Sequence, residues 1–87
     1  MPVKIVRSGT EDGATLDVLV TVLGQNTASV AGADGHRLTQ LLGKWSNGRG
    51  IGNPEFDIES TSVTLRRCRV SKMSGRSNIE VQFMERE

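Results

Sequence analysis

The residues most suited to bind a partner are five cations in one short stretch of the chain. Residues 60–79 contain no carboxylate, although the net charge of the whole protein at pH 7 is only +1. The five are Arg66, Arg67, Arg69, Lys72 and Arg76. A patch of one sign on a balanced protein is a place where an acidic partner docks. These side chains are therefore the first candidates for a binding surface.

The candidates considered for catalysis are Cys68 and His36, the one Cys and the one His of the chain. The neighbouring Arg67 and Arg69 would favour a Cys68 thiolate if the sulfur faced solvent, but Cys68 lies on a predicted strand that favours its burial. His36 has no Ser or Asp in a recognisable catalytic arrangement around it. We expect Cys68 to be structural and the protein not to be an enzyme.

Metal and cofactor chemistry find equally little support in the sequence. One Cys and one His do not make a structural zinc site. The carboxylates Glu55, Asp57 and Glu59 alternate along one predicted strand, which is the pattern of a solvated rim and not of an acid/base pair. We expect no metal and no cofactor.

A glycine-rich loop, residues 48–52, invites comparison with phosphate-binding loops. Those loops place an anion at the N-terminus of a helix, whereas this one follows a predicted helix, where the dipole has the opposite sign. The spacing also matches neither the dinucleotide pattern nor the Walker pattern. We interpret it as a connector whose tip, Arg49 and Ile51, adds to an interaction surface.

The N-terminal third of the sequence predicts strands. Residues 3–7 form a short β-type run, and residues 8–14 form a turn. Residues 15–23 have the period-2 alternation of a half-buried strand, and Leu19 and Leu23 break it in a way that predicts a central strand covered on both faces. A third strand is predicted at residues 27–31.

One helix is predicted at about residues 35–47. Its apolar residues recur at the spacing i, i+3, i+4 and i+7, and they are Leu38, Leu41, Leu42 and Trp45. Asp34 is the predicted N-cap, and Asn47 with Gly48 is the predicted stop. This stripe is wide enough for the helix to lie across one face of a sheet.

The C-terminal third predicts further strands with irregular register. Phe56 and Ile58 are even-numbered, whereas Val63 and Leu65 are odd, so a bend or bulge is expected at residues 60–62 and a second slip near Arg66. A turn at residues 72–77 leads into a last strand. Its predicted inward face is Ile79, Val81 and Phe83.

These elements predict one α+β domain over residues 1–87. We expect a small antiparallel sheet of four to five strands with the helix packed on one face, in the order β-β-(β)-α-β-β. The length of 87 residues is near the lower limit for a self-sufficient core. Burial against a second chain would help such a domain.

The preferred interpretation is a non-enzymatic protein-interaction module of the partner-docking, inhibitor or assembly type, a profile that structural subunits of mobile elements and viruses share. Its partner would be a protein with an acidic surface, or the chain itself as a homo-oligomer. The docking residues would be Arg49, Ile51, Arg66, Arg67, Arg69, Lys72 and Arg76.

Two other interpretations stay open. Residues 66–76 would bind nucleic acid as a basic hairpin, or the cations would only pair with Glu80, Glu85 and Glu87 and keep an exposed strand soluble. The lone Cys and the lack of a long apolar run predict a cytoplasmic protein that does not enter a membrane.

Overall fold

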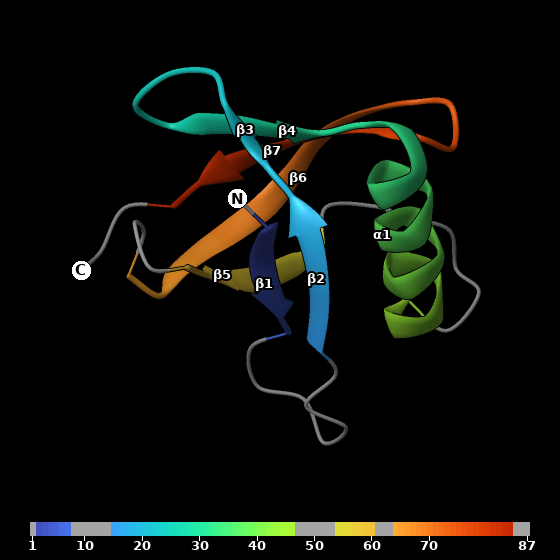
Figure 1. The fold of residues 1–87 in the computed structure, drawn as a ribbon, viewed down its shortest axis with the longest axis horizontal. Coiled ribbons are helices and arrows are strands. Elements are labelled where there is room, and N and C mark those ends of the chain that lie inside the picture. The colour runs from blue at the N-terminus through green and yellow to red at the C-terminus, as the bar shows by residue number, and fades with distance from the viewer. Residues whose placement is uncertain (1, 8–14, 47–53, 61–63, 85–87) are drawn as a thin grey trace.

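The computed structural model describes residues 2–7, 15–46, 54–60 and 64–84. The chain is α+β, with one helix and an antiparallel sheet in the order β-β-β-β-α-β-β-β (Figure 1). The elements are β1 (Pro2–Val6), β2 (Thr15–Leu19), β3 (Thr21–Val22), β4 (Thr27–Val30), α1 (Gly32–Trp45), β5 (Glu55–Glu59), β6 (Arg66–Ser74) and β7 (Asn78–Phe83). The turn and the glycine loop predicted at residues 8–14 and 48–52 lie outside the described residues.

The seven strands follow the spatial order β2-β1-β5-β6-β7-β4-β3. The C-terminal strands β5, β6 and β7 form a meander in the middle, and the N-terminal pairs β1–β2 and β3–β4 extend it on either side. The predicted four to five strands were too few. Residues 15–23 divide into two strands, residues 27–30 form a further strand before the helix, and three strands follow the helix where two were predicted.

The segment 15–22 is not the central strand that its apolar pattern predicts. β2 lies at one end of the strand order and β3 at the other, although only Val20 separates them in sequence. Because one short segment supplies both end strands, the sheet must curl until its two ends meet (Figure 1). The result is a half-barrel with a concave inner face.

The core fills this concave face. Alternate residues of each strand point inward, as the period-2 pattern requires, and the predicted inward face of Ile79, Val81 and Phe83 is confirmed. The other buried apolar residues are Val3, Ile5, Val18, Ala28, Val30, Leu38, Leu42, Trp45, Phe56, Ile58, Cys68 and Val70. The Trp45 and Phe56 rings pack with centroids 6.4 Å apart, and the Arg7 guanidinium lies 5.4 Å from the Trp45 ring centroid.

Helix α1 covers the side of the half-barrel formed by β2, β4 and β7 (Figure 1). Its predicted apolar stripe is confirmed, with Leu38, Leu42 and Trp45 buried. The helix begins at Gly32, earlier than predicted, and the N-cap residue is Ala31 and not Asp34. Asp34 lies inside the first turn, where its carboxylate serves a neighbouring strand instead. No described helix has both the length and the apolar character needed to cross a membrane.

The register of the C-terminal strands corrects a second expectation. β5 pairs with β6 without a break from Glu55 to Ile58, so the slip predicted near Arg66 is wrong. The irregularity lies between Val70 and Lys72, where β6 carries a bulge against β7. The turn after β6 is confirmed, and Gly75 adopts a φ of 72° there. The bend predicted at residues 60–62 falls largely outside the described residues.

The helix meets the β6–β7 turn at Gly35. A Cβ added to Gly35 would collide with the backbone carbonyl of Ser77 and lie 2.9 Å from the carbonyl oxygen of Val30. Gly43, in the same helix, has nothing within 4 Å of an added Cβ. The two glycines therefore differ in the space around them and not in their secondary structure.

Gly35→Ala should lower the free energy of unfolding by about 2–3 kcal/mol, because backbone on both sides cannot yield as a flexible side chain would. Gly43→Ala is the matched control and should raise it by about 0.5–1 kcal/mol, since alanine favours the helix. Urea unfolding followed by Trp45 fluorescence measures both. Equal effects of the two substitutions would contradict the close packing of α1 against the turn.

Candidate docking edge

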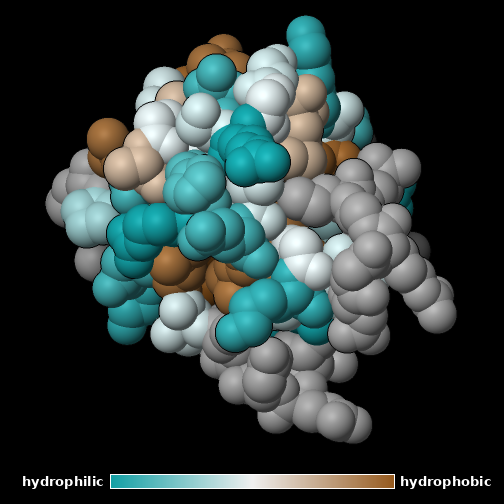
Figure 2. All heavy atoms as spheres, turned by 90° about the vertical axis from the view of Figure 1, so that its right-hand side faces the viewer, coloured by the Kyte–Doolittle hydropathy of each residue, from teal (hydrophilic) through white to brown (hydrophobic). Residues whose placement is uncertain are grey.

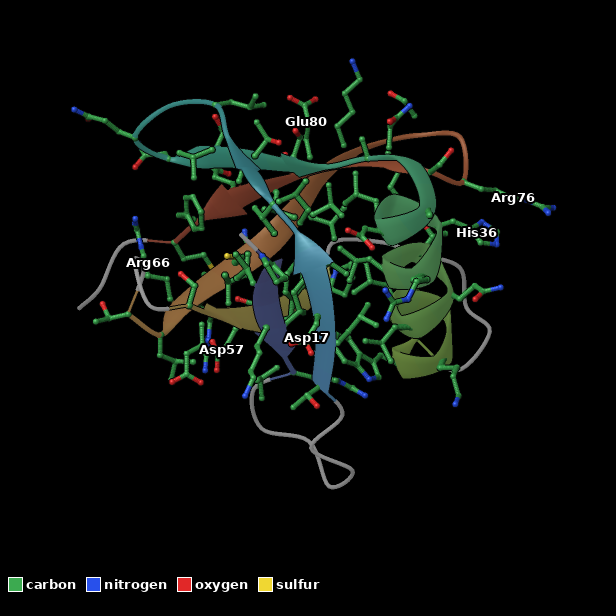
Figure 3. The ribbon with its side chains drawn as sticks, viewed as in Figure 1. Asp17, His36, Asp57, Arg66, Arg76 and Glu80 are labelled. Carbon is green, nitrogen blue, oxygen red and sulfur yellow. The ribbon has the colours of Figure 1, made fainter. Side chains whose placement is uncertain are left out.

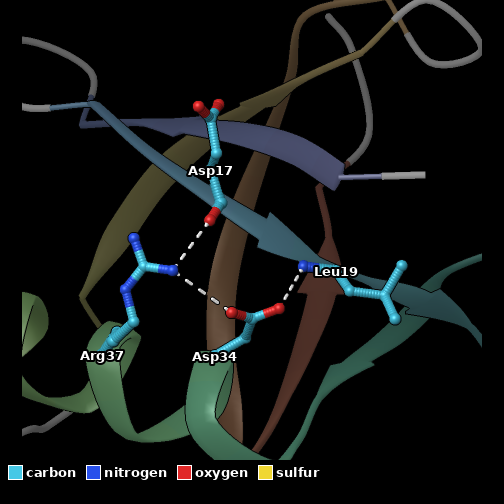
Figure 4. Close-up of polar contacts among 4 residues, drawn as sticks. All are labelled: Asp17, Leu19, Asp34 and Arg37. Atoms are coloured by element: carbon cyan, nitrogen blue, oxygen red, sulfur yellow. Dashed lines mark hydrogen bonds and ion pairs between the residues drawn. The ribbon is translucent and has the colours of Figure 1, made fainter.

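One edge of the segment 15–23 is occupied at β2 by side chains of the helix (Figure 4). The Leu19 N–H donates to Asp34 Oδ2 at 2.8 Å, and Arg37 Nη1 donates to the carbonyl oxygen of Asp17 at 3.3 Å. Arg37 Nη1 also lies 3.3 Å from Asp34 Oδ1, which fixes the two side chains to each other. Together they take the place of a neighbouring strand along the edge of β2 that faces away from β1.

The segment at and around β3 is covered far less. We call residues 19–23 the edge segment. Leu19, Val22 and Leu23 are 52%, 58% and 54% exposed, although they are large and apolar. Val22 is the Cα partner of Ala28, and Leu23 follows it on the opposite face because successive side chains alternate. The edge segment is therefore apolar and exposed on both of its faces.

The edge segment also lacks the charges that normally protect an edge strand. Residues 18–33 contain no Asp, Glu, Lys, Arg or His, in a chain of which 24% is charged. Natural sheets usually place Lys, Pro or inward-pointing charges on an exposed edge to prevent pairing with another chain. β3 itself has two residues, and this shortness limits such pairing.

Two open pockets lie on the described surface. The first, of about 250 Å³, adjoins the edge segment at Leu23 and is lined further by Val30 and Ile79, with Lys72 and Glu80 at its border. The second, of about 280 Å³, lies by Arg69, Gln82 and Phe83. Neither pocket is lined by a His or a Cys. The first pocket extends the apolar surface of the edge segment toward β7.

The five cations predicted to form one patch are spread along the whole hairpin. Arg66 lies at one end of the molecule and Arg76 at the other (Figure 3). β6 spans nine residues from Arg66 to Ser74, and at ~3.3 Å per residue its ends are roughly 25 Å apart. The structure therefore does not gather these side chains into one cluster.

Two of the cations are paired with carboxylates on β5. Arg67 Nε lies 3.8 Å from Asp57 Oδ1, and Arg69 Nη2 lies 3.5 Å from Glu55 Oε1. Both pairs follow from the β5–β6 register, in which these residues are Cα partners. Asp57 is only 9% exposed, so the prediction that it belongs to a solvated rim is wrong. The exposed Arg69–Glu55 pair contributes little stability, but both carboxylates lower the positive potential of this face.

The remaining predicted docking residues have separate surroundings. The Arg66 guanidinium lies 4.5 Å from the centroid of the Phe83 ring. Lys72 and Arg76 are exposed, and Lys72 is the Cα partner of Glu80, one of the carboxylates expected to pair with the cations. Arg49 and Ile51, as well as Glu85 and Glu87, lie outside the described residues.

Cys68 is fully buried between Phe56 and Phe83, its Cα partners on β5 and β7. Burial raises the pKa of its thiol from 9.0 to about 12; Arg66 lowers the pKa and Asp57 raises it, but both effects are smaller. The predicted burial of Cys68 on its strand is confirmed, and a thiol with so high a pKa stays neutral at physiological pH. Cys68 is therefore not an activated nucleophile.

The outward face of α1 offers a different kind of surface. Figure 2 shows the helix side of the molecule, where hydrophilic side chains predominate and apolar atoms show only in limited areas. His36, Gln40 and Lys44 are among the exposed helix residues. Within the described ranges, no three His, Cys, Asp or Glu residues come close enough together to hold a metal ion.

The edge segment was missed by the interpretation of the sequence, although one signal was present. An apolar run without charges fits either a strand covered on both faces or an edge strand left open. The choice between them depends on strand order, which the local pattern does not contain. The absence of any charged residue from 18 to 33 was the feature that could have raised the second possibility.

The buried thiol should resist alkylation in the native protein. At pH 8 a pKa of about 12 leaves about one thiolate in ten thousand, so iodoacetamide should label Cys68 rapidly only after unfolding in urea. Mass spectrometry of native and unfolded samples measures the two rates, with Cys68→Ser as the blank. Because the folded pKa is raised, its stabilising contribution is complete below pH 9 and is lost as the pH rises toward 12. Equal labelling of native and unfolded protein would contradict the burial.

No family model, curated protein or solved structure matches the chain. No residue therefore inherits a role from a relative, and the geometry of the edge segment carries the functional conclusion.

Proposed function

We propose that this chain is a small, non-enzymatic protein-interaction module that docks through the edge segment. The single observation that carries the proposal is the half-exposed apolar trio of Leu19, Val22 and Leu23 on an uncharged edge. Full burial of each side chain by a partner would contribute about 1 kcal/mol, because roughly half of each is already buried.

The chemistry of an open strand edge favours a protein as the partner. β3 pairs with β4 on one side, and no described strand pairs with its other side. Another polypeptide strand supplies both donors and acceptors at the spacing that such an edge requires. Lys72, at the border of the neighbouring pocket, and Arg76, on the hairpin tip, would add attraction for a partner with acidic residues beside its docking strand.

The edge segment should be required for capture of partners. The wild-type protein, used as bait in a lysate of the source organism with a chemical crosslinker, should retain a protein that Val22→Glu loses. Leu65→Glu is the matched control, because Leu65 is 49% exposed but lies outside the edge segment. Capture that is unaffected by Val22→Glu, or the absence of any captured protein with a strictly monomeric bait, would overturn the proposal.

Nucleic-acid binding by residues 66–76 stays a competing prediction with weaker support. Arg67 and Arg69 already have carboxylate partners, and Arg66 lies against Phe83. Lys72 and Arg76 are then the exposed cations of that hairpin that form no ion pair with a described residue. A gel shift at about 50 mM salt with duplex DNA, single-stranded DNA and RNA should show no binding. Binding that weakens steeply with salt and with Lys72→Ser and Arg76→Ser together would favour the alternative.

A further inference from the structure

The two edges of the segment 15–23 differ in what completes them. Along the edge that faces α1 and β4, Asp34 and Arg37 occupy the Asp17 and Leu19 positions, and β4 pairs with Thr21 and Val22. Along the other edge, β1 pairs with residues 15–19 and no described strand pairs with the residues that follow. Among the described residues, one sheet edge is therefore closed by the helix, and the other, at β3, has no neighbouring strand.

The hydrogen bonds of the β3–β4 hairpin identify the backbone groups at the open edge. The Leu23 N–H donates to the carbonyl oxygen of Thr27 at 2.9 Å, so the Leu23 backbone faces β4. Backbone groups of successive strand residues point to alternate sides of a strand in an antiparallel ladder. The N–H and C=O of Val22 therefore face away from β4, toward the open edge, and by the same alternation those of Val20 do too.

From this register we infer that the partner of the open edge is a second copy of the chain. The inference rests on the proposed function and names its partner. The two copies pair β3 against β3 in antiparallel orientation about a two-fold axis, with the N–H and C=O of one Val22 bonded to the C=O and N–H of the other. A residue whose donor and acceptor both face outward is self-complementary across such an axis.

The absence of charge from residues 18–33 suits pairing with a second copy of the chain. An edge without charged side chains offers a foreign strand no electrostatic register, whereas a two-fold axis supplies register by symmetry. It also brings no like charges together, because residues 18–33 of both copies are uncharged. Leu19, Val22 and Leu23 of each copy would lose their exposed apolar area together.

The closed edge of β2 determines the size of the assembly. A sheet with two open ends can add copies indefinitely, whereas Asp34 and Arg37 leave this one with a single open edge. Self-pairing at β3 therefore ends at a dimer. Because the paired edge is short, the interface belongs to the small and weak class, with a dissociation constant in the range of about 10–100 µM.

Sedimentation velocity of the purified protein from about 5 µM to about 500 µM tests the inference, since this range spans the expected dissociation constant. The wild-type protein and the Leu65→Glu control should pass from monomer to dimer. Val22→Glu should raise the dissociation constant by at least about tenfold, because two carboxylates would face each other across the axis. Val22→Pro should do the same by removing the outward N–H while leaving the β3–β4 bonds intact. Circular dichroism confirms that each variant is folded.

A disulfide reports the register directly. In a hydrogen-bonded antiparallel pair the two Cα atoms lie about 5.5 Å apart, within the range that a disulfide spans. Val22→Cys should form a crosslinked dimer under mild oxidation, whereas Leu65→Cys should not. The native Cys68 will not interfere, because it is buried and its raised pKa keeps it a neutral thiol.

The outcomes separate this inference from the proposed function. A protein that stays monomeric over the whole range, a dimer that both Val22 substitutions leave unchanged, or assembly beyond a dimer would each overturn the inference. If the monomer still captures a different protein in a Val22-dependent manner, the proposed function stands and only the identity of the partner is wrong. If no such capture occurs either, both fall.

Discussion

The fold depends on one covalent constraint, which is that residues 15–22 supply both end strands of the sheet. β2 and β3 are joined through Val20 alone, so the five strands between them in space must bend until the first and the last are adjacent. This curvature creates the concave face that holds Phe56, Ile58 and Val81. A lean chain thereby encloses a core with one sheet, and the helix has to cover only the gap that remains between β2, β4 and β7.

The local spacing of apolar residues was sufficient to predict the helix and the last strand. The helix followed from the spacing of Leu38, Leu42 and Trp45, and the last strand followed from its alternation. Strand order was out of reach, because pairing between β1 and β5 or between β4 and β7 joins segments far apart in sequence. The role of Asp34 likewise depends on a contact with a segment that is distant in sequence. Its position before an apolar stripe fits an N-cap, yet its carboxylate accepts a hydrogen bond from the backbone N–H of Leu19 in β2, which is distant in sequence.

The candidate site lies on the edge segment and not on the predicted cations, and the reason is again the order of the strands. A run of cations without carboxylates is a real feature of residues 60–79, but its potential depends on which strand lies next to it. β5 brings Glu55 and Asp57 to Arg69 and Arg67, and the local charge balance of the sequence does not reveal this pairing. Conversely, the apolar stretch that looked like an interior strand lies at the rim. Leu19 and Leu23, predicted to be covered, are exposed, and Asp57, predicted to be solvated, is buried.

The arrangement of the sheet also has a consequence for the order of its assembly. The pairs β1–β2 and β3–β4 are formed by neighbouring segments, but in space they stand on opposite sides of the meander β5–β6–β7. Loop closure between distant segments is slow, and contacts of high sequence separation govern the folding rate. A ribosome that has released only the first half of the chain therefore presents two hairpins with no central sheet between them. The sheet can form completely only after the C-terminal meander has been synthesised, because its strands join the two hairpins.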